Sequence, residues 1–539
     1  MELIDNLKLN IQNALLRLNI EVSVNDIVID ISKEKAHGDY ATNSALKFSK
    51  LAGKNPRQLA QELIDNLDLS NIDKVEIAGP GFINFFMKND SLASIVSKII
   101  NEGDNFGRGT TKNKKINVEF VSANPTGSLH VGHARGAAIG DSICRILSFN
   151  GYDVTREYYI NDAGNQINNL GLSLIERYKE LLGLPYALPE DGYHGQEIIE
   201  ATKKIRKEFG DNLLDNKDYL SFFKTEGMKI MLNQIREDLN VFGVKFDIFS
   251  SELEVRKNGA VEKEIEYLDK YSYVEDGATI LKTTDFLDDK DRVIVKSNGD
   301  YTYFLPDIVY HVHKLSRGYD KLIDVLGADH HGYINRMKSA LIMHGYDKDV
   351  LHVELIQMVR IMKGDTEIKA SKRTGGAYTL RELCEDAGVD AGRYFFAMRA
   401  ASSHLDFDLD LAKEQSSNNP VYYSQYAHAR LCSILDSAND IDLDISGIHL
   451  NKDSETSLLK HLASFPQVVE TSANEKAPYK ITNYVHELAE KVHAFYTECR
   501  VIDRDNLEVT QSRLALCKAS QQVIKNALYL VGVNAPTHM

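Results

Sequence analysis

Three features that would each define a class of protein are missing from this sequence. The five cysteines lie far apart and form no Cys-x-x-Cys pair, which argues against a structural zinc site and a disulfide framework. No stretch is long and apolar enough to span a bilayer. Cations are not in excess, because 78 acidic residues outnumber 63 lysines and arginines and leave a net charge of −15. That charge counts against nonspecific nucleic-acid binding but allows a local basic face.

The length and composition are those of a soluble protein with several domains. A chain of 539 residues is too long for one hydrophobic core, so we expect two to four domains. Its 43% hydrophobic and 26% charged residues are ordinary for soluble proteins. The start of the chain is amphipathic with early acids, which favours a folded helix over a signal peptide. We therefore expect a cytoplasmic protein that has no membrane partner.

The most informative stretch is EFVSANPTGSLHVGH, residues 119–133. It continues an apolar strand pattern, Ile116–Val121, and leads through a polar turn into apolar residues at helical spacing. Backbone N–H groups point outward at a helix N-terminus, so this arrangement can hold a phosphate. His130 and His133 would add donors to charge that develops on a phosphorus centre. An HxxH pair can also be half of a metal site, or two surface histidines with satisfied hydrogen bonds.

A second candidate phosphate loop is IKASKRTGGAYTL, residues 368–380, where cations lie beside two glycines and a helix follows. A mobile cationic loop can close on a triphosphate and stabilise the charge on departing pyrophosphate. Taken alone, such a segment is equally well read as a solvated basic turn. Its position about 240 residues after the HVGH turn, with a helical region next, favours the functional reading.

Two acidic residues indicate a cationic substrate. Glu119 lies in an otherwise apolar strand, and a buried carboxylate without a partner is unfavourable. A guanidinium could supply that partner through two parallel hydrogen bonds. Asp307 is a second candidate acid, with Tyr303 one helical turn earlier. The alternatives are a structural salt bridge for Glu119 and a helix-terminus acid for Asp307.

The stretch ANPTGSLHVGHARG resembles the HIGH signature of class I aminoacyl-tRNA synthetases, in the form found in arginyl-tRNA synthetases. Residues 368–380 resemble their KMSKS loop, with Ala370 in place of methionine and Arg373 in place of the last serine. The resemblance implies catalytic roles for His130, His133, Lys369 and Lys372. It implies that ATP, accompanied by Mg²⁺, is bound by His130, Gly132, His133, Lys369, Ser371 and Lys372, and that there is no tightly bound metal.

The same resemblance implies a pocket for arginine. Its members would be Glu119, Ser122, Asn124, Tyr303, Asp307 and His330, with Ser122 holding the α-amino end. Asp329 and His330 begin the run Asp-His-His, which has no third metal ligand at a useful spacing. The two acids Glu119 and Asp307 argue against glutamine or cysteine as the amino acid.

Two further segments resemble RNA-binding parts of arginyl-tRNA synthetases. HGDYATN, residues 37–43, resembles a signature of their N-terminal domain, which reads the tRNA D-loop; the structural alternative is a capped helix start. In NPVYYSQYAHARLCSI, residues 419–434, aromatics interleave with cations, which suits unstacked bases of an anticodon loop; the alternative is an aromatic bundle core. The implied tRNA contacts are Asp39, Tyr40, Asn43, Tyr426, Tyr496 and Met539.

The order of elements agrees with this resemblance, because strands alternate with helices in the middle of the chain and helical periodicity follows. We predict a multidomain α/β fold: a Rossmann-like parallel-sheet catalytic domain, an N-terminal α+β domain and a C-terminal α-helical bundle. The domains would span residues 1–110, 111–404 and 405–539, with a helical insertion around 165–250. Strands are expected at Ile116–Val121, Asp153–Tyr159, Val293–Lys296 and Lys321–Leu326, and none after about residue 405.

The predicted function is that of an arginine–tRNA ligase. The chain would activate L-arginine with ATP to arginyl-adenylate and pyrophosphate, then transfer arginine to the 3′ end of its cognate tRNA(Arg). As in the family, we expect a monomer that needs bound tRNA before it activates arginine. One rival reading is a non-catalytic tRNA-binding paralogue, which the intact histidines and lysines disfavour. Another is a metallohydrolase built on the HxxH pair, which lacks further ligands.

Overall fold

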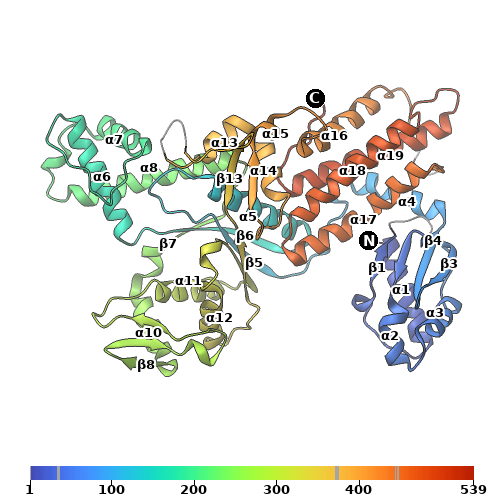
Figure 1. The fold of residues 1–539 in the computed structure, drawn as a ribbon, viewed down its shortest axis with the longest axis horizontal. Helices are drawn as coiled ribbons and strands as arrows, with labels where there is room; N and C mark the ends of the chain where they lie inside the picture. The colour runs from blue at the N-terminus through green and yellow to red at the C-terminus, as the bar shows by residue number, and fades with distance from the viewer. Residues whose placement is uncertain (1, 33–36, 371–375, 444, 446–447) are drawn as a thin grey trace.

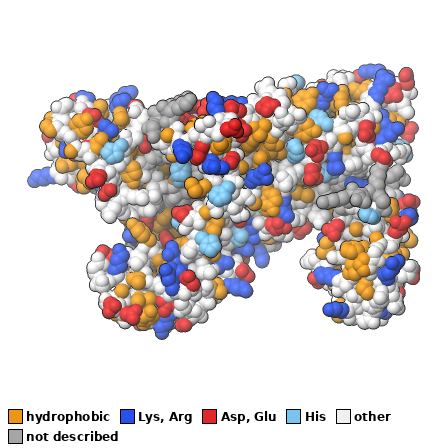
Figure 2. All heavy atoms as spheres, in the orientation of Figure 1, with side chains coloured by type: hydrophobic (Ala, Val, Ile, Leu, Met, Phe, Trp, Pro, Cys, Tyr) orange, Lys and Arg blue, Asp and Glu red, His pale blue; other side chains and the backbone are white. Residues whose placement is uncertain are grey.

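The computed structural model describes residues 2–32, 37–370, 376–443, 445 and 448–539. Figure 1 shows a central α/β unit, a helical insertion at its far left, and a long helical bundle to its right. The N-terminal unit lies below the bundle (Figure 1). The same view drawn as spheres shows a deep notch between the N-terminal unit and the lower part of the central unit, with acidic and basic side chains mixed over this face (Figure 2).

The N-terminal unit is a four-stranded antiparallel sheet, in the order β1-β2-β4-β3, packed with helices. Asn55 and Pro56 explain the start of one helix: the Asn55 side chain accepts the Arg57 N–H, and proline suits the first helical position. The elements are α1 (Glu2–Arg17), β1 (Ile29–Ile31), β2 (Tyr40–Thr42), α2 (Ser44–Ala52), α3 (Pro56–Asp65), β3 (Ile72–Ala78), β4 (Phe82–Met87) and α4 (Asn89–Glu102).

The central sheet has five parallel strands in the order β12-β11-β5-β6-β7. They are β5 (Lys115–Phe120), β6 (Asp153–Ile160), β7 (Ile248–Ser251), β11 (Lys321–Gly327) and β12 (Leu351–Ile356). Strand order reverses between β5 and β11, and ligands of such sheets bind beyond the carboxyl ends of strands at that reversal. Helix α5 (Val131–Phe149) follows β5 and packs closely on it, because a Cβ on Gly140 would overlap the Phe120 ring.

Two insertions interrupt this sheet. The predicted helical insertion is present between β6 and β7 as α6 (Asn165–Leu181), α7 (Gln196–Phe209) and α8 (Tyr219–Val241). A second insertion, which the sequence pattern did not predict, follows β7. Its elements are α9 (Glu252–Val255), α10 (Ala260–Leu268), β8 (Ser272–Glu275), β9 (Ala278–Leu281) and β10 (Arg292–Val295). Helices α11 (Phe304–Ser316) and α12 (Tyr333–Met343) then flank β11 in the chain. The strand predicted at Val293–Lys296 is β10, but it pairs antiparallel with β9 and lies outside the parallel sheet.

A small sheet and a helical bundle complete the chain. The prediction of no strand after about residue 405 is wrong, because β15 (Leu405–Asp408) pairs in parallel with β13 (Val359–Lys363). The pattern fails there because the strand is only four residues long, although Leu405 and Phe407 alternate inward. The other elements are β14 (Thr366–Glu367), α13 (Leu380–Ala387), α14 (Val389–Ala397), α15 (Leu409–Lys413), α16 (Pro420–Asp436), α17 (Asp453–Glu475), α18 (Tyr479–Glu498) and α19 (Leu507–Leu530).

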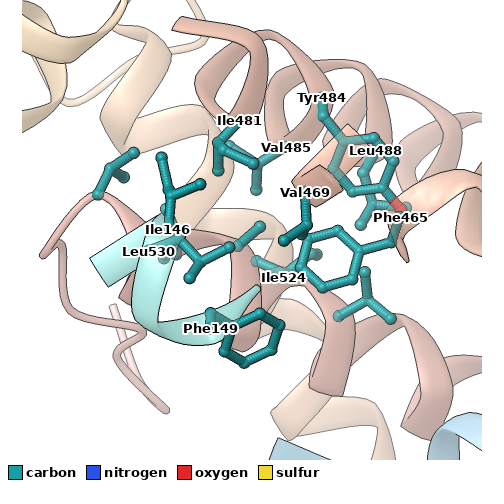
Figure 3. Close-up of a cluster of buried hydrophobic side chains, with 14 of the residues drawn as sticks. Ile146, Phe149, Phe465, Val469, Ile481, Tyr484, Val485, Leu488, Ile524 and Leu530 are labelled. Carbon is teal, nitrogen blue, oxygen red and sulfur yellow. The ribbon is translucent and has the colours of Figure 1, made fainter. Parts of the chain in front are cut away.

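The bundle core continues into the central unit. Ile146 and Phe149, near the end of α5, lie among apolar side chains of α17, α18 and α19, including Phe465, Val485 and Ile524 (Figure 3). Burying such side chains stabilises a fold by about 1.5–3 kcal/mol each. The helix that begins at the HVGH turn therefore ends inside the bundle.

A buried ionic network reinforces the same junction. Arg393 of α14 donates to Asp141 of α5 (2.6 Å), to the Val531 carbonyl (3.1 Å) and to the Phe242 carbonyl (3.1 Å). Burial alone would raise the pKa of Asp141, but Arg393 and two further arginines hold that pKa below its usual value. One guanidinium thus joins α5, α14, the end of α8 and the segment after α19.

We predict that Arg393→Met destabilises this junction strongly. It leaves Asp141 buried beside fewer cations, and breaking a buried ion pair costs about 3–5 kcal/mol. Urea unfolding and hydrogen exchange of α5 measure the loss. The matched control is Arg360→Met, which breaks the exposed Arg360–Asp406 pair and should change little. Equal effects of the two substitutions would contradict the assignment.

Candidate active site

A cavity of about 680 Å³ opens at the carboxyl ends of β5 and β11, where strand order reverses. It gathers eight of the residues proposed from the sequence: Glu119, Ser122, Asn124, His130, Gly132, His133, Asp307 and His330. These residues come from three separate parts of the chain, residues 119–133, Asp307 and His330, so their meeting in one cavity depends on the fold. Val121 and Ser122, where β5 ends, have φ of +68° and +38°, a strained conformation for non-glycine residues that is common at functional sites.

The two histidines are fixed at the N-terminus of α5. His130 Nδ1 accepts the Gly132 N–H (3.1 Å), and His133 Nδ1 accepts the His130 N–H (3.3 Å). Their rings stack with centroids 3.8 Å apart. Because Nδ1 accepts in both rings, a neutral imidazole carries its proton on Nε2, which is left as a donor. Burial lowers the pKa of both, and with the neighbouring His130 it lowers that of His133 to about 3.

The C-terminal end of the cationic loop (residues 368–380) is hydrogen-bonded to this histidine turn. The Val131 N–H donates to the Tyr378 carbonyl (3.0 Å), and the Leu380 N–H donates to the Leu129 carbonyl (2.8 Å). The next helix begins at once, with Thr379 and Glu382 forming a reciprocal cap. One end of the loop is therefore held beside the histidines. Lys369, near the other end of the loop, is exposed and does not line the cavity, while Ser371 and Lys372 lie outside the described residues.

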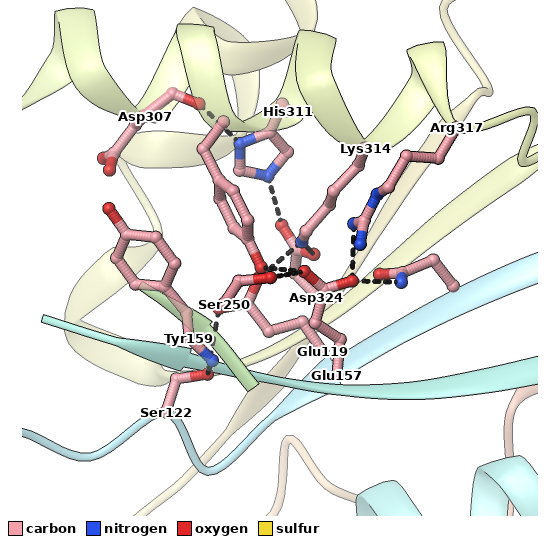
Figure 4. Close-up of polar contacts among 12 residues, drawn as sticks. Glu119, Ser122, Glu157, Tyr159, Ser250, Asp307, His311, Lys314, Arg317 and Asp324 are labelled. Carbon is pink, nitrogen blue, oxygen red and sulfur yellow. Dashed lines mark hydrogen bonds and ion pairs between the residues drawn. The ribbon is translucent and has the colours of Figure 1, made fainter. Parts of the chain in front are cut away.

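The floor of the cavity is a buried cluster of charges (Figure 4). Lys314 of α11 is fully buried and pairs with Glu119 of β5 and with Asp324 of β11 (3.2 Å). Lys314 keeps its charge, since these carboxylates raise its pKa against the effect of burial. The expectation that substrate supplies the cationic partner of Glu119 is thus corrected: the protein supplies one itself. Asp307, His311 and Lys314 are spaced i, i+4, i+7 on one helix face, a signal that the sequence reading missed.

Asp307 is the carboxylate that the cluster leaves free. It points into the cavity (Figure 4), and among the described residues no cation lies within ion-pair distance of it. Burial raises the pKa of Asp307 to about 7, and the negative charges of Glu252 and Glu119 act in the same direction. A bound cation would reverse this shift, because it favours the ionised carboxylate.

Tyr159 is a cavity residue that the sequence reading missed. Its hydroxyl points toward the Asp307 carboxylate (Figure 4) and has no hydrogen-bond partner among the described residues. The alternation of β6, which puts Glu157 and Tyr159 on one face of the sheet, could have indicated it. Buried hydroxyls are normally satisfied, so this one is available to a ligand.

Two of the residues proposed to bind the substrate arginine, Tyr303 and Ser122, are placed differently from the others. Tyr303 is 78% exposed at the start of α11 and does not line the cavity. The Ser122 hydroxyl lines it but already donates to Glu119 (3.0 Å) and accepts the Tyr159 N–H (3.0 Å). Ser122 therefore orients Glu119 whether or not it also meets a ligand.

The residues proposed to contact tRNA lie in two places, the helical bundle and the N-terminal unit. Tyr426, Tyr496 and Met539 line one groove of about 370 Å³ in the bundle. Arg430 lies over the Tyr496 ring (4.4 Å to its centroid) and donates to the Tyr496 hydroxyl (2.6 Å). An exposed aromatic ring beside a guanidinium can hold an unstacked base.

The residues of the HGDY turn do not fit direct RNA contact. Tyr40 is fully buried under the N-terminal sheet, and Asp39 is buried against a lysine of the bundle. Neither side chain can reach a ligand on the surface in this conformation, because protein atoms cover both. Asn43 is half-buried at the start of α2, where its side chain makes no capping hydrogen bond. The expectation for Asp39 and Tyr40 is corrected accordingly.

The described residues contain no group of three or more His, Cys, Asp or Glu placed to hold a metal ion. His330 lines the cavity and lies 3.6 Å from the Asp329 carboxylate, with both largely exposed. No helix in the described part of the chain is both long and apolar enough to cross a membrane.

Three family descriptions match successive parts of the chain. These are "Arginyl tRNA synthetase N terminal domain" over residues 5–87, "tRNA synthetases class I (R), catalytic domain" over 95–395, and "DALR anticodon binding domain" over 424–539. The chain is 49% identical to "Arginine--tRNA ligase" of Bacillus subtilis (strain 168), covering 99% of both chains. It is also 49% identical to that of Shouchella clausii (strain KSM-K16), again covering 99% of both. The Thermus thermophilus arginyl-tRNA synthetase structure shares its fold, with a TM-score of 0.79, 20% identity and 99% of both chains covered.

The parallel sheet, the histidine turn at its carboxyl edge and the match over 95–395 define a class I aminoacyl-tRNA synthetase. Within that class the chain belongs to the arginyl-tRNA synthetase family. It is a ligase that joins arginine to tRNA at the expense of ATP. The reading as a non-catalytic paralogue has no support.

We predict that His133 stays neutral throughout the pH range in which the enzyme works. Its pKa of about 3 lies below that range, so its Nε2–H donor is present from pH 5 upward. Carbon-detected NMR of ¹³C-labelled histidine, with His133→Gln for assignment, measures the titration. A midpoint below 5 supports the buried neutral donor, and a midpoint near 6.5 would contradict it.

Proposed function

We propose that the cavity binds the guanidinium of arginine at Asp307 and the phosphates of ATP at the N-terminus of α5. The observation that carries this is the carboxylate of Asp307, which faces the cavity while its neighbours Glu119 and Asp324 are paired with Lys314. A guanidinium is the natural partner of a planar carboxylate in a partly buried site. The unpartnered Tyr159 hydroxyl would accept a further guanidinium N–H.

The charge of the cavity floor supports a cationic substrate. Three carboxylates of the floor are paired inside the protein: Glu119 with Lys314, Asp324 with Lys314 and His311, and Glu157 with Arg317. Asp307 is the fourth, and among the described residues no cation lies within ion-pair distance of it. A carboxylate left without a partner in a desolvated site would favour a positively charged ligand over neutral amino acids of similar size. Lys314 and Ser122 hold the Glu119 carboxylate in place, so that it can meet the substrate through its remaining acceptor capacity. Ser122, Asn124 and His330 would complete the arginine pocket, with Tyr303 reaching it only if its end of α11 moves.

The chemistry needs charge stabilisation more than proton transfer. A carboxylate oxygen of arginine attacks the α-phosphorus of ATP, a new P–O bond forms, and the bond to the leaving pyrophosphate breaks. Negative charge spreads over the phosphate oxygens as this happens. The Nε2–H donors of His130 and His133 would meet that charge at the positive end of the α5 helix dipole.

The loop residues would act on the departing group. Lys369, Ser371 and Lys372 would bind the outer phosphates, and Mg²⁺ would arrive with ATP. The hydrogen bonds of Tyr378 and Leu380 to the histidine turn support this role, since they hold the C-terminal end of the loop beside the cavity. The terminal ribose hydroxyl of tRNA then attacks the activated carboxyl and releases AMP.

The division of labour along the chain follows. Residues 1–110 would contact the tRNA D-loop, residues 111–404 would carry the chemistry, and residues 405–539 would bind the anticodon. The groove of Tyr426, Tyr496 and Met539 supports the last assignment, because Arg430 and the rings form a platform for a base. We infer a monomeric cytoplasmic enzyme that activates arginine only with tRNA bound.

We predict that ATP–pyrophosphate exchange occurs with arginine alone among the twenty amino acids, and only when tRNA is added. The physical reason is that the anionic floor selects the guanidinium, while the bundle that binds tRNA shares its core with α5. Lys369→Met serves as the control, because Lys369 is proposed to bind ATP and not arginine. It should lower the exchange rate without changing which amino acid is used. Exchange with lysine or a neutral amino acid would refute the site, and strong exchange without tRNA would refute the tRNA requirement.

We predict that the KM for arginine depends on pH through Asp307. Its pKa is about 7 without a ligand, and only the ionised form binds the guanidinium. Below pH 7 a proton must leave before arginine binds, so the KM rises by about tenfold per pH unit. Above pH 7 it levels off. Steady-state aminoacylation between pH 5.5 and 8.5 measures this.

Two variants sharpen the test of Asp307. Asp307→Asn should raise the KM and abolish its pH dependence, because no proton is then displaced. Asp329→Asn, which removes an exposed carboxylate from the rim of the same cavity, should keep the pH dependence. A flat KM in the unmodified enzyme, or an unchanged slope in Asp307→Asn, would show that arginine binds elsewhere.

A further inference from the structure

The Asp39 side chain is fixed within the N-terminal unit by the turn that carries it. Gly38 has φ +79°, and a Cβ there would lie 2.6 Å from the Phe85 carbonyl oxygen, so the turn needs glycine. The Asp39 N–H donates to that same carbonyl (2.7 Å). One carboxylate oxygen accepts the Met87 N–H at the end of β4. The HGDY turn thus aims the other oxygen of Asp39 in a set direction.

That second oxygen meets the bundle. It pairs with the ammonium of Lys460, which lies on α17. The two side chains are only 11% and 15% exposed, so the pair is largely shielded from water. In such surroundings, removing one partner leaves an uncompensated charge and is strongly unfavourable. The contact therefore resists separation far more than an exposed ion pair would.

Around this pair the two units are not closely packed. A cavity of about 720 Å³ separates β1 and the HGDY turn from α17 and α18, with Ile29 and Ser32 on one side and His461, Tyr484 and Lys491 on the other. Close packing, which would otherwise fix their relative orientation, is missing along that space.

Helix α4 makes another attachment between the N-terminal unit and the bundle. Helix α4 packs on α17 and α19, the Ser97 hydroxyl donates to the Ile445 carbonyl (2.6 Å), and Asn526 donates to the Gly103 carbonyl (3.0 Å). Only Lys88 separates α4 from β4, the last strand of the N-terminal sheet. A sheet held at this one junction could pivot about it. A second fixed point removes that freedom.

We propose that the Asp39–Lys460 pair is a positioning contact that sets the orientation of the N-terminal sheet relative to the helical bundle. It rests on the proposed function, in which both units bind one tRNA, because their mutual orientation then fixes the span between the two RNA-binding surfaces. In this proposal the HGDY turn affects RNA binding by orienting the N-terminal sheet, and Asp39 does not contact the RNA.

The first test measures orientation in the free protein. Spin labels at Leu51→Cys of α2 and Leu507→Cys of α19, both exposed, are placed in a Cys384→Ser background, and their distance distribution is recorded by pulsed electron paramagnetic resonance. The distribution should be narrow, and Lys460→Met should broaden it. The matched control is Lys480→Met, which removes a lysine from the same cavity that pairs with Glu475 inside the bundle; it should leave the distribution narrow. A distribution unchanged by Lys460→Met would overturn the proposal.

The second test measures the consequence for tRNA. Asp39→Asn and Lys460→Met should each raise the KM for tRNA by roughly tenfold, while kcat and the KM for arginine change little. The double variant should be no worse than either single one, because both remove the same contact. Lys460→Arg, which keeps the charge, should restore a low KM. Impairment by Asp39→Asn with none by Lys460→Met would mean that Asp39 touches RNA itself, and would overturn the proposal.

The orientation of the N-terminal sheet and the binding of tRNA are measured independently by the two tests. The distance measurement needs no RNA, so it still decides whether the pair orients the N-terminal sheet if the enzyme binds tRNA in another way. Circular dichroism and thermal unfolding of each variant confirm that the comparison is between folded proteins.

Discussion

The ion pairs of Lys314 with Glu119 and Asp324 are the interaction on which the rest of the active site depends. The lysine reaches from α11 to β5 and β11, the two strands between which the order of the sheet reverses. Without this cation, three carboxylates would lie close together in a desolvated space, and their mutual repulsion would protonate some of them. With it, Glu119 and Asp324 have a cationic partner inside the protein, and Asp307 is left without one among the described residues. The site therefore contains one carboxylate, Asp307, whose ionised form a cationic ligand would stabilise.

Helix α5 connects the two chemical tasks of the molecule. Its first turn holds the histidines at the cavity, its middle carries Asp141 in the arginine network, and its last turn lies in the bundle core (Figure 3). A displacement of the bundle would move a rigid helix whose other end carries the phosphate donors, because closely packed cores transmit strain. This gives a physical basis for a dependence of arginine activation on bound tRNA. Such a coupling would run through Arg393, which joins α5, α14 and the segment after α19 in one network.

Local patterns in the sequence predicted much of this architecture. The strands β5, β6 and β11 lie within a residue or two of their expected bounds, since apolar runs and turn residues mark them. The histidine turn was found from its motif and its place between a strand and a helix. Features that depend on contact between distant segments were not found. The partner of Glu119 lies 195 residues away, and the partner of Asp39 lies 421 residues away. Burial of Tyr40 was not predicted for the same reason, because a motif indicates which residues matter but not whether they face water.

The measurement that tests this account most directly is a crystal structure of the enzyme with L-arginine bound. We expect the guanidinium to lie against the Asp307 carboxylate and the Tyr159 hydroxyl, with the Lys314–Glu119 pair intact beneath it. A guanidinium that displaces Lys314 from Glu119, or that binds away from Asp307, would contradict the claim that the protein balances every carboxylate of the floor except the one reserved for its substrate.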